Sequence, residues 1–399
     1  MVITMRIVLA CMMLIFAASV VSADIWVAGE GASRLLKMSD EGNILAASSD
    51  LRTPVDLDFD PGDESIWVVD EMSNLVVKLD KEGNTLFKIG YRTFIDTRDI
   101  RYQPANSWYG AVRERIPKTS EINMPKALAV DPEDSSVWIA NAGLNTVMHV
   151  DKEGNELGSY AGFRNPQDVT VNKRTGEVWI ANTDDDTVIK MSKDGRRMFA
   201  KPGFYHPVMI ELEADGTAWV VDSDHDEIVK VNQQGNILLR TKGLDEALPA
   251  RARKRARGYK TFSNPMAIGI DDKHKTVWVA DTENYRLVRL GMDGITKSVV
   301  NNLPGKPMTV KVDSEGNVYV TMERSSHVLK VSPSGRIIGR IDEFTRPWTV
   351  LVVPSKDKSN LLTGNVVSSS SIQPSDALQL IALFSLLGVL IATVQKISN

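Results

Sequence analysis

The chain has 399 residues, with 47 Lys and Arg against 51 Asp and Glu, which gives a formal net charge of −4. Proteins that bind the nucleic-acid backbone are usually basic, so this balance disfavours a nucleic-acid partner. Hydrophobic residues make up 43% of the chain, the usual share for a globular protein, and this excludes wholesale disorder. A single cysteine, Cys11, excludes a disulfide framework and a zinc site built on cysteines.

Residues 1–23 have the pattern of a secretory signal peptide. Arg6 supplies a positive charge, an apolar run follows, and Val21-Ser22-Ala23 fits the small-residue rule for cleavage. Cys11 lies inside this segment, so the mature chain would contain no cysteine and would depend on no disulfide. We therefore expect the body of the protein to lie outside the cytoplasm.

The C-terminal residues have the pattern of a stalk followed by a membrane anchor. Residues 354–376 are polar and serine-rich, which is typical of a flexible stalk. Residues 377–394 are almost wholly apolar, and at about 1.5 Å per residue such a helix would just cross a bilayer core. Residues 395–399 would then form a short cytoplasmic tail of a single-pass cell-membrane protein. A C-terminal core helix and a tail removed by processing are the alternatives.

Between these ends, a short sequence motif, which consists of an aromatic residue among small aliphatic residues, occurs seven times. Its spacings are 41, 71, 41, 40, 59 and 41 residues. A proline opens an alternating run ahead of each of the last six copies, and two more strand candidates follow each copy, joined by a turn that ends in glycine. Four strands in about 41 residues is the period of a β-propeller blade. The aromatic residues, expected in the core, are Trp26, Trp67, Trp138, Trp179, Trp219, Trp278 and Tyr319.

The first aromatic residue, Trp26, has no proline-led strand before it. A strand of that kind stands at the far end of the repeats, at residues 347–353. We expect it to complete the first blade and close the ring, because closure leaves no free edge strand. The predicted fold is all-β: a seven-bladed β-propeller of four-stranded antiparallel blades over residues 24–353, with a C-terminal transmembrane helix. A six-bladed ring with a degenerate end is the alternative.

The repeat resembles the NHL family of β-propellers, whose unit has an opening proline strand, an aromatic strand ending in Asp, and a Lys- or Arg-containing strand before a glycine turn. The clearest copy runs from Val277-Trp278-Val279-Ala280-Asp281 to Arg289. The resemblance covers nearly all of residues 24–353. It implies the propeller fold and leaves function open, because the family includes enzymes, RNA binders and extracellular sensors.

Two insertions, at residues 91–124 and 245–264, interrupt the repeat, and both follow fourth strands. Strand direction places them on the face that carries the loops after the aromatic strands, which we call the top face. Loops on a rigid scaffold commonly carry binding sites, so we predict binding there. The candidate anchors are Trp108, Tyr109, Arg113, Arg251, Arg253, Lys254, Arg255, Arg257, Tyr259 and Lys260.

These features predict a membrane-anchored extracytoplasmic module that binds a ligand or protein, or acts as a scaffold, through its top-face loops. The basic second insertion favours a protein or an anionic polymer as the partner, although a solvated loop is the alternative interpretation. A nucleic-acid partner and a required cofactor are not expected. The polar residues that end the aromatic strands should hydrogen-bond their own loop backbone. They are Asp70, Asn141, Asn182, Asp222 and Asp281.

The alternative function is a metal-dependent lyase or a lactonase-type hydrolase with an axial site. A cation such as Ca²⁺ or Zn²⁺ would need carboxylates and histidines, here Asp56, Asp168, His206, Glu211 and His225. The NHL resemblance implies that an amidating lyase would carry metal-binding histidines directly after the opening prolines. Those positions hold no histidine, so we predict a non-enzyme. They are Val55, Lys126, Gln167, Val208, Met266, Met308 and Trp348.

Overall fold

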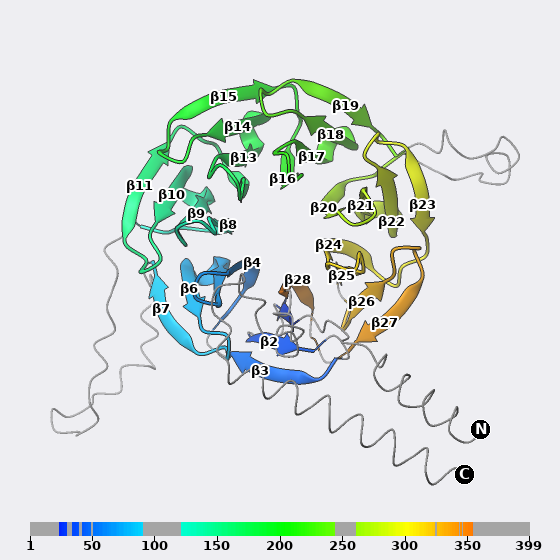
Figure 1. Ribbon diagram of the computed structural model, residues 1–399, viewed down its shortest axis with the longest axis horizontal. Helices are drawn as coiled ribbons and strands as arrows, with labels where there is room; N and C mark the ends of the chain where they lie inside the picture. The colour runs from blue at the N-terminus through cyan, green and yellow to red at the C-terminus, as the bar shows by residue number, and fades with distance from the viewer. Residues whose placement is uncertain are drawn as a thin grey trace, which may run out of the picture. The chain divides into compact units, whose positions relative to one another are not determined.

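The computed structural model describes residues 24–29, 34–39, 42–48, 51–90, 121–243, 261–323, 325–342, 344 and 346–353. These residues form seven four-stranded antiparallel sheets, arranged as the blades of a ring (Figure 1). The innermost strands of consecutive blades contact one another around the whole ring. The seven-bladed prediction is confirmed, and the six-bladed alternative is wrong.

The predicted signal peptide, stalk, membrane anchor and tail lie outside the described residues. Within the described ranges, the search for a helix with the length and apolar character to span a bilayer found none. Residues 23–354 cluster as one compact unit, and the propeller lies within it.

The strands are given blade by blade, from the axis outward. Blade I has β28 (Pro347–Val353), β1 (Asp24–Gly29), β2 (Arg34–Met38) and β3 (Ile44–Ser48); blade II has β4 (Pro54–Asp60), β5 (Ser65–Asp70), β6 (Leu75–Leu79) and β7 (Thr85–Ile89). Blade III has β8 (Pro125–Val130), β9 (Val137–Asn141), β10 (Thr146–Val150) and β11 (Glu156–Ala161); blade IV has β12 (Pro166–Val171), β13 (Val178–Asn182), β14 (Thr187–Met191) and β15 (Arg197–Pro202).

Blade V has β16 (Pro207–Leu212), β17 (Ala218–Asp222), β18 (Glu227–Val231) and β19 (Ile237–Thr241); blade VI has β20 (Pro265–Asp271), β21 (Thr276–Asp281), β22 (Arg286–Gly291) and β23 (Thr296–Val300). Blade VII has β24 (Lys306–Val312), β25 (Val318–Glu323), β26 (Val328–Val331) and β27 (Ile337–Ile341). Five short 3-10 turns follow second strands: η2 (Glu71–Ser73), η3 (Ala142–Leu144), η4 (Thr183–Asp185), η5 (Ser223–His225) and η6 (Thr282–Asn284).

The last strand of the chain closes the ring, as the sequence predicts. β28 pairs antiparallel with β1, with Leu351 opposite Trp26 and Val350 opposite Val27. The two ends of the propeller therefore share blade I, and the ring is held shut by backbone hydrogen bonds and not by a covalent link.

The seven aromatic residues form the centres of the blades, and each is at most 1% exposed. Each lies opposite a basic residue or a histidine on the third strand of its own blade. Six cationic groups lie 4.9–5.8 Å from the ring centroids, which is cation–π geometry, and His149 stacks on Trp138 at 4.1 Å. The six are Lys37, Lys78, Lys190, Lys230, Arg289 and Lys330.

Four of these lysines also tie their blade to the next one. Lys78 Nζ, for example, donates to the carbonyl oxygen of Lys152 in the bottom turn of blade III, at 3.0 Å. Lys37, Lys190 and Lys230 make the equivalent bond at 3.0, 3.1 and 3.3 Å. One side chain thus stabilises both its own blade and the packing between blades.

The polar residues that end the second strands bond backbone N–H groups, as predicted, but those groups belong to the segment before their inner strand and not to their own loop. Asp70 accepts the backbone N–H groups of Arg52 at 2.9 Å and Thr53 at 2.7 Å. The other four residues each accept one N–H of the segment that leads into their own inner strand. These bonds fix the top-face loops against the start of each blade.

Candidate functional site

The ten predicted anchor residues of the two insertions lie outside the described residues, but the ends of both insertions are described. The Asn123 N–H donates to Asn141 Oδ1 at 2.8 Å, and the Ser263 N–H donates to Asp281 Oδ1 at 2.8 Å. Both acceptors belong to top-face loops. The described ends of the insertions, residues 121–124 and 261–264, therefore lie at the top face.

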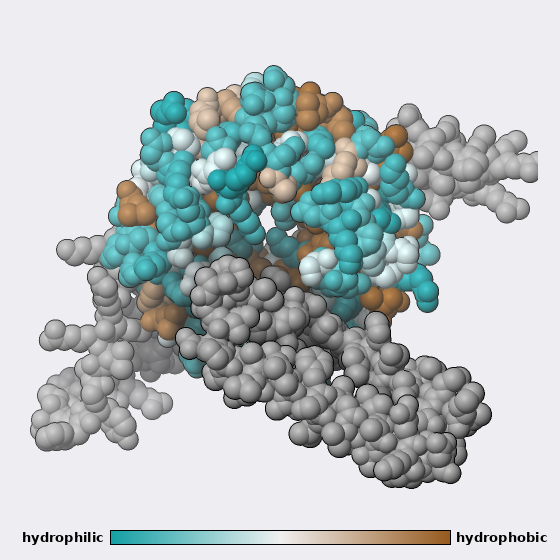
Figure 2. All heavy atoms as spheres, in the orientation of Figure 1, coloured by the Kyte–Doolittle hydropathy of each residue, from teal (hydrophilic) through white to brown (hydrophobic). Residues whose placement is uncertain are grey.

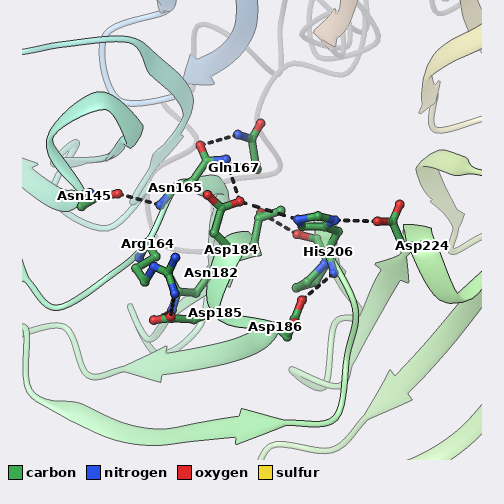
Figure 3. Close-up of polar contacts among 12 residues, drawn as sticks. Asn145, Arg164, Asn165, Gln167, Asn182, Asp184, Asp185, Asp186, His206 and Asp224 are labelled. Atoms are coloured by element: carbon green, nitrogen blue, oxygen red, sulfur yellow. Dashed lines mark hydrogen bonds and ion pairs between the residues drawn. The ribbon is translucent and has the colours of Figure 1, made fainter.

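His206 lies on the top face between two acidic side chains from neighbouring blades (Figure 3). Its Nδ1 is 2.5 Å from Asp224 Oδ2, and its Nε2 is 3.7 Å from Asp184 Oδ1. The hydrogen bond to Asp224 and the charges of the surrounding acids raise the pKa of His206. Asn165 donates to Asp184 Oδ1 at 3.0 Å, so the acid of blade IV is itself held in place.

His225 lies in the same part of the top face but bonds to a different acid. Its Nδ1 is 2.9 Å from Asp222 Oδ2. The ring of Tyr205 stacks on His206 at a centroid distance of 5.3 Å and contacts His225 at 5.6 Å. The sequence analysis did not predict Tyr205 as a site residue. Its position directly before His206 and Pro207 is the sequence feature that indicates it.

The five candidate metal ligands do not come together. His206 and His225 lie on the top face, whereas Asp56, Asp168 and Glu211 lie on inner strands around the axis. Within the described ranges, no three His, Cys, Asp or Glu side chains are grouped closely enough to hold a metal ion. The described residues therefore do not form the predicted single axial site of carboxylates with His206, because the histidines lie in top-face loops and the carboxylates lie on inner strands.

The inner strands enclose a polar channel on the axis, and the space-filling view shows the hollow at the centre of the ring (Figure 2). A cavity of about 240 Å³ lies among β4, β8, β12, β16, β24 and β28. A second cavity, of about 480 Å³, shares Lys173, Glu211 and Lys311 with the first and extends to Arg174 and Asp272 in bottom turns. The channel therefore opens at the bottom face, opposite the insertions.

Strand register arranges the axial residues in two layers. The residues two positions after the opening prolines form the upper layer. The residues that pair with the seven aromatic residues form the lower layer. The upper layer holds Asp56, Ala127, Asp168, Met209, Ala267, Thr309 and Thr349. The lower layer holds Asp58, Ala129, Thr170, Glu211, Gly269, Lys311 and Leu351.

Three of the axial carboxylates have a structural role between blades. The inner strand of each blade is an edge strand, so the N–H groups on its axial edge have no partner strand. The Leu128 N–H donates to Asp56 Oδ2 at 2.9 Å, and the Ile210 N–H donates to Asp168 Oδ2 at 2.6 Å. Asp58 accepts from β8 in the same way, at 2.9 Å. Each carboxylate thereby satisfies the edge of the next blade with one oxygen atom.

Lys311 is the cation at the centre of this channel. Its Nζ lies 3.4 Å from Glu211 Oε1, which belongs to blade V, two blades away. Burial alone would lower the pKa of Lys311, but the charges of Glu211, Asp56, Asp58 and Asp168 raise it above its usual value. The surrounding carboxylates therefore favour the ammonium form of Lys311.

The half-buried carboxylates around Lys311 have raised pKa values. Burial raises the pKa of Asp168 to about 7 and that of Asp56 to about 6. Burial likewise raises the pKa of Asp58. Lys126, on the inner strand of blade III, pairs with Glu71 on the top face, at 2.5 Å.

No protein-family model and no curated protein matches this chain. Solved structures share its fold. A streptogramin B lyase is 14% identical, with a TM-score of 0.56, over 75% of this chain and 87% of that chain. A virginiamycin B lyase from Staphylococcus aureus is 13% identical, with a TM-score of 0.54, over 72% of this chain and 84% of that chain.

A functionally unknown protein from Desulfotomaculum acetoxidans is 12% identical, with a TM-score of 0.59, over 83% of this chain and 98% of that chain. The chain is a seven-bladed β-propeller. At these identities the likeness shows the fold alone, because one propeller scaffold supports many unrelated functions. The NHL resemblance therefore stays a prediction.

Proposed function

We propose that this propeller is a membrane-anchored, extracytoplasmic binding module and that its top face holds a protein or an anionic polymer. The placement of exposed apolar side chains carries the proposal. Among the described residues, those side chains lie on the top face, on the outermost strands, or, for Ile295, in the turn before β23. The members on the top face are Met72, Met124, Leu144, Tyr205, Tyr285 and Trp348.

Several charged groups of the described top face are paired between blades. Glu71 pairs with Lys126 at 2.5 Å, Asp184 faces His206, and Glu283 pairs with Lys306 at 2.6 Å, in each case between adjacent blades. The sequence of the second insertion is basic, and we infer that it adds positive charge to this face. That charge favours an acidic partner.

The direction of the end strands suits a tethered receptor. β28 runs from the top face to the bottom face, because it pairs antiparallel with β1. The last described residue, Val353, therefore lies on the bottom side, and we propose that an anchor follows it. The anchor itself is part of the proposal.

A charge-reversal experiment tests the proposal. The double variant Arg253→Glu with Arg255→Glu should bind immobilised dextran sulfate about tenfold or more weakly than the wild type, and its binding should depend less on salt. The matched control is Arg196→Glu with Arg336→Glu, which makes the same charge change at two exposed bottom-turn positions. Equal losses in both variants, or no loss in the first, would contradict top-face binding.

One observation favours the alternative, a metal-dependent lyase or hydrolase: four carboxylates line the smaller axial cavity. This alternative predicts a tightly bound divalent ion in protein purified without chelator. Elemental analysis that finds about one Ca²⁺, Zn²⁺ or Fe per chain would support it. Metal-free protein that still binds dextran sulfate would support the binding module.

A further inference from the structure

We propose that the axial channel is a second binding site, which takes a small aliphatic amine through its ammonium group. The site is built from Asp56, Asp58, Asp168, Glu211 and Lys311. It goes beyond the proposed function, since the channel opens at the bottom face and the proposed partner surface is the top face.

The channel has room for a small ligand because blade III contributes little side-chain volume to it. Ala127 and Ala129 of blade III stand between the acids of blades II and IV. The resulting cavity of about 240 Å³ is larger than the space of a few water molecules.

The charges that line the cavity do not balance. Four carboxylates and two ammonium groups, those of Lys173 and Lys311, line it. Lys311 is committed to Glu211 at 3.4 Å, and the charge of Lys173 acts mainly on Asp58. Among the described residues, no ion pair within 4 Å includes Asp56 or Asp168, and the charge of Lys311 acts on both from a longer range. Each accepts a backbone N–H of the next blade.

An ammonium group fits this arrangement better than a metal ion. A metal ion needs several ligand atoms at about 2–2.6 Å, and the described residues contain no cluster of three such ligands. An ammonium group carries three donors and can share them between separated carboxylates. The rest of the cavity wall suits an aliphatic stem, since it includes Leu128, Ile210 and Leu351.

Binding of an amine should be linked to proton release. Near neutral pH, Asp168 and Asp56, with pKa values of about 7 and about 6, hold part of a proton in the empty channel. A bound ammonium group lowers both pKa values and displaces that proton. A cation that binds only to the exposed surface would displace no such proton.

Titration calorimetry of the full-length protein with 1,4-diaminobutane tests the proposal, at about pH 7 in two buffers of different ionisation enthalpy. We expect saturable binding of one amine per chain with release of protons. Asp168→Asn should weaken binding about tenfold or more and reduce the proton release. The Asn side chain keeps an oxygen atom for the Ile210 N–H, so the contact between blades is preserved. Asp293→Asn, in a bottom turn of blade VI, is the matched control and should change nothing.

Three results would overturn the proposal: no saturable binding, equal weakening by Asp293→Asn, or tighter one-to-one binding of Ca²⁺ or Mg²⁺ than of the amine. Thermal unfolding of Asp168→Asn at about pH 8 keeps a folding defect separate, since this variant should unfold at a higher temperature than the wild type. Its binding to dextran sulfate should be unchanged. Failure of the amine site is therefore distinguishable from failure of the top-face proposal.

Discussion

At the scale of single residues, the propeller depends on carboxylates and amides that replace missing backbone partners. Asp70 and its four equivalents serve the top-face loops, and Asp56, Asp58 and Asp168 serve the edges of inner strands. Both sets satisfy backbone N–H groups that would otherwise be buried without a partner. Polar residues near the axis and at the blade ends therefore have a structural role before any role in binding.

Asp70 gives the first prediction at this scale. Asp70→Ala removes the acceptor of two N–H bonds in a fully buried position, so it should lower the free energy of unfolding by roughly 2 to 4 kcal/mol. Asp70→Asn, which copies Asn141 and Asn182, should cost clearly less because it keeps one acceptor oxygen. Urea unfolding measures both, and equal costs would show that the bonds contribute nothing.

Asp168 predicts a pH dependence with a definite sign. Folding raises the pKa of Asp168 from 3.8 to about 7. The stability that its proton contributes is therefore fully present below pH 3.8 and is lost as the pH rises through about 7. Ionised and buried, Asp168 destabilises the fold at higher pH. Asp168→Asn should therefore be more stable than the wild type at about pH 8, and this gain should shrink towards about pH 4. A gain that grows on acidification would be inconsistent with the raised pKa.

His206 predicts a second pH effect, confined to the top face. Its pKa lies above the ordinary 6.5, mainly because of Asp224, so this contact stabilises the fold below pH 6.5 and is lost as the pH rises through the raised pKa. Asp224→Asn should lower the melting temperature more at about pH 5.5 than at about pH 9. An NMR titration of His206 should show its pKa falling in the variant, and an unchanged pKa would reject the pairing.

At the scale of elements, all seven blades share one arrangement of the third strand and of the turn that joins it to the fourth strand. The third strand carries a Lys, an Arg or, in blade III, His149 against the aromatic ring, and the following turn ends in a glycine with positive φ. These glycines are not equivalent: an added Cβ at Gly42 would make an ordinary contact with Ile341 at 3.7 Å, whereas at Gly195 it would collide with the ring of Tyr160.

This difference predicts unequal costs for the same substitution. Gly42→Ala should cost about 1 kcal/mol from backbone strain alone, since its φ is +92°. Gly195→Ala, at φ +83°, should cost at least about 1 kcal/mol more because Tyr160 must also move. Gly195→Ala combined with Tyr160→Ala should recover that excess in urea unfolding. Equal costs for the two glycines would contradict the close contact.

Much of the fold was predictable because each blade carries local signals. The opening prolines, the aromatic residues and the glycine turns mark strands at a regular period, and they identified β28 as the closing strand. One further signal was available: in every blade the residue eleven positions after the aromatic is the cation or histidine that covers it. The axial pairings carry no such signal. Lys311 and Glu211 are 100 residues apart, and only the closed ring brings them together.

At the scale of the whole molecule, the ring separates two kinds of surface. The top face carries exposed apolar residues, matched ion pairs and the ends of both insertions, while the bottom face carries the mouth of a charged channel. β28 and β1 place both ends of the propeller on the bottom side. The division predicts that a large partner and a small ligand would bind on opposite faces without competing.

Hydrogen–deuterium exchange of the full-length protein with and without dextran sulfate tests the central claim, that partners bind the top face. The account predicts slower exchange in the top-face turns η2 to η6 and unchanged exchange in the bottom turns around Gly83, Gly154 and Gly195. Protection of the bottom turns, with the top-face turns unchanged, would contradict it.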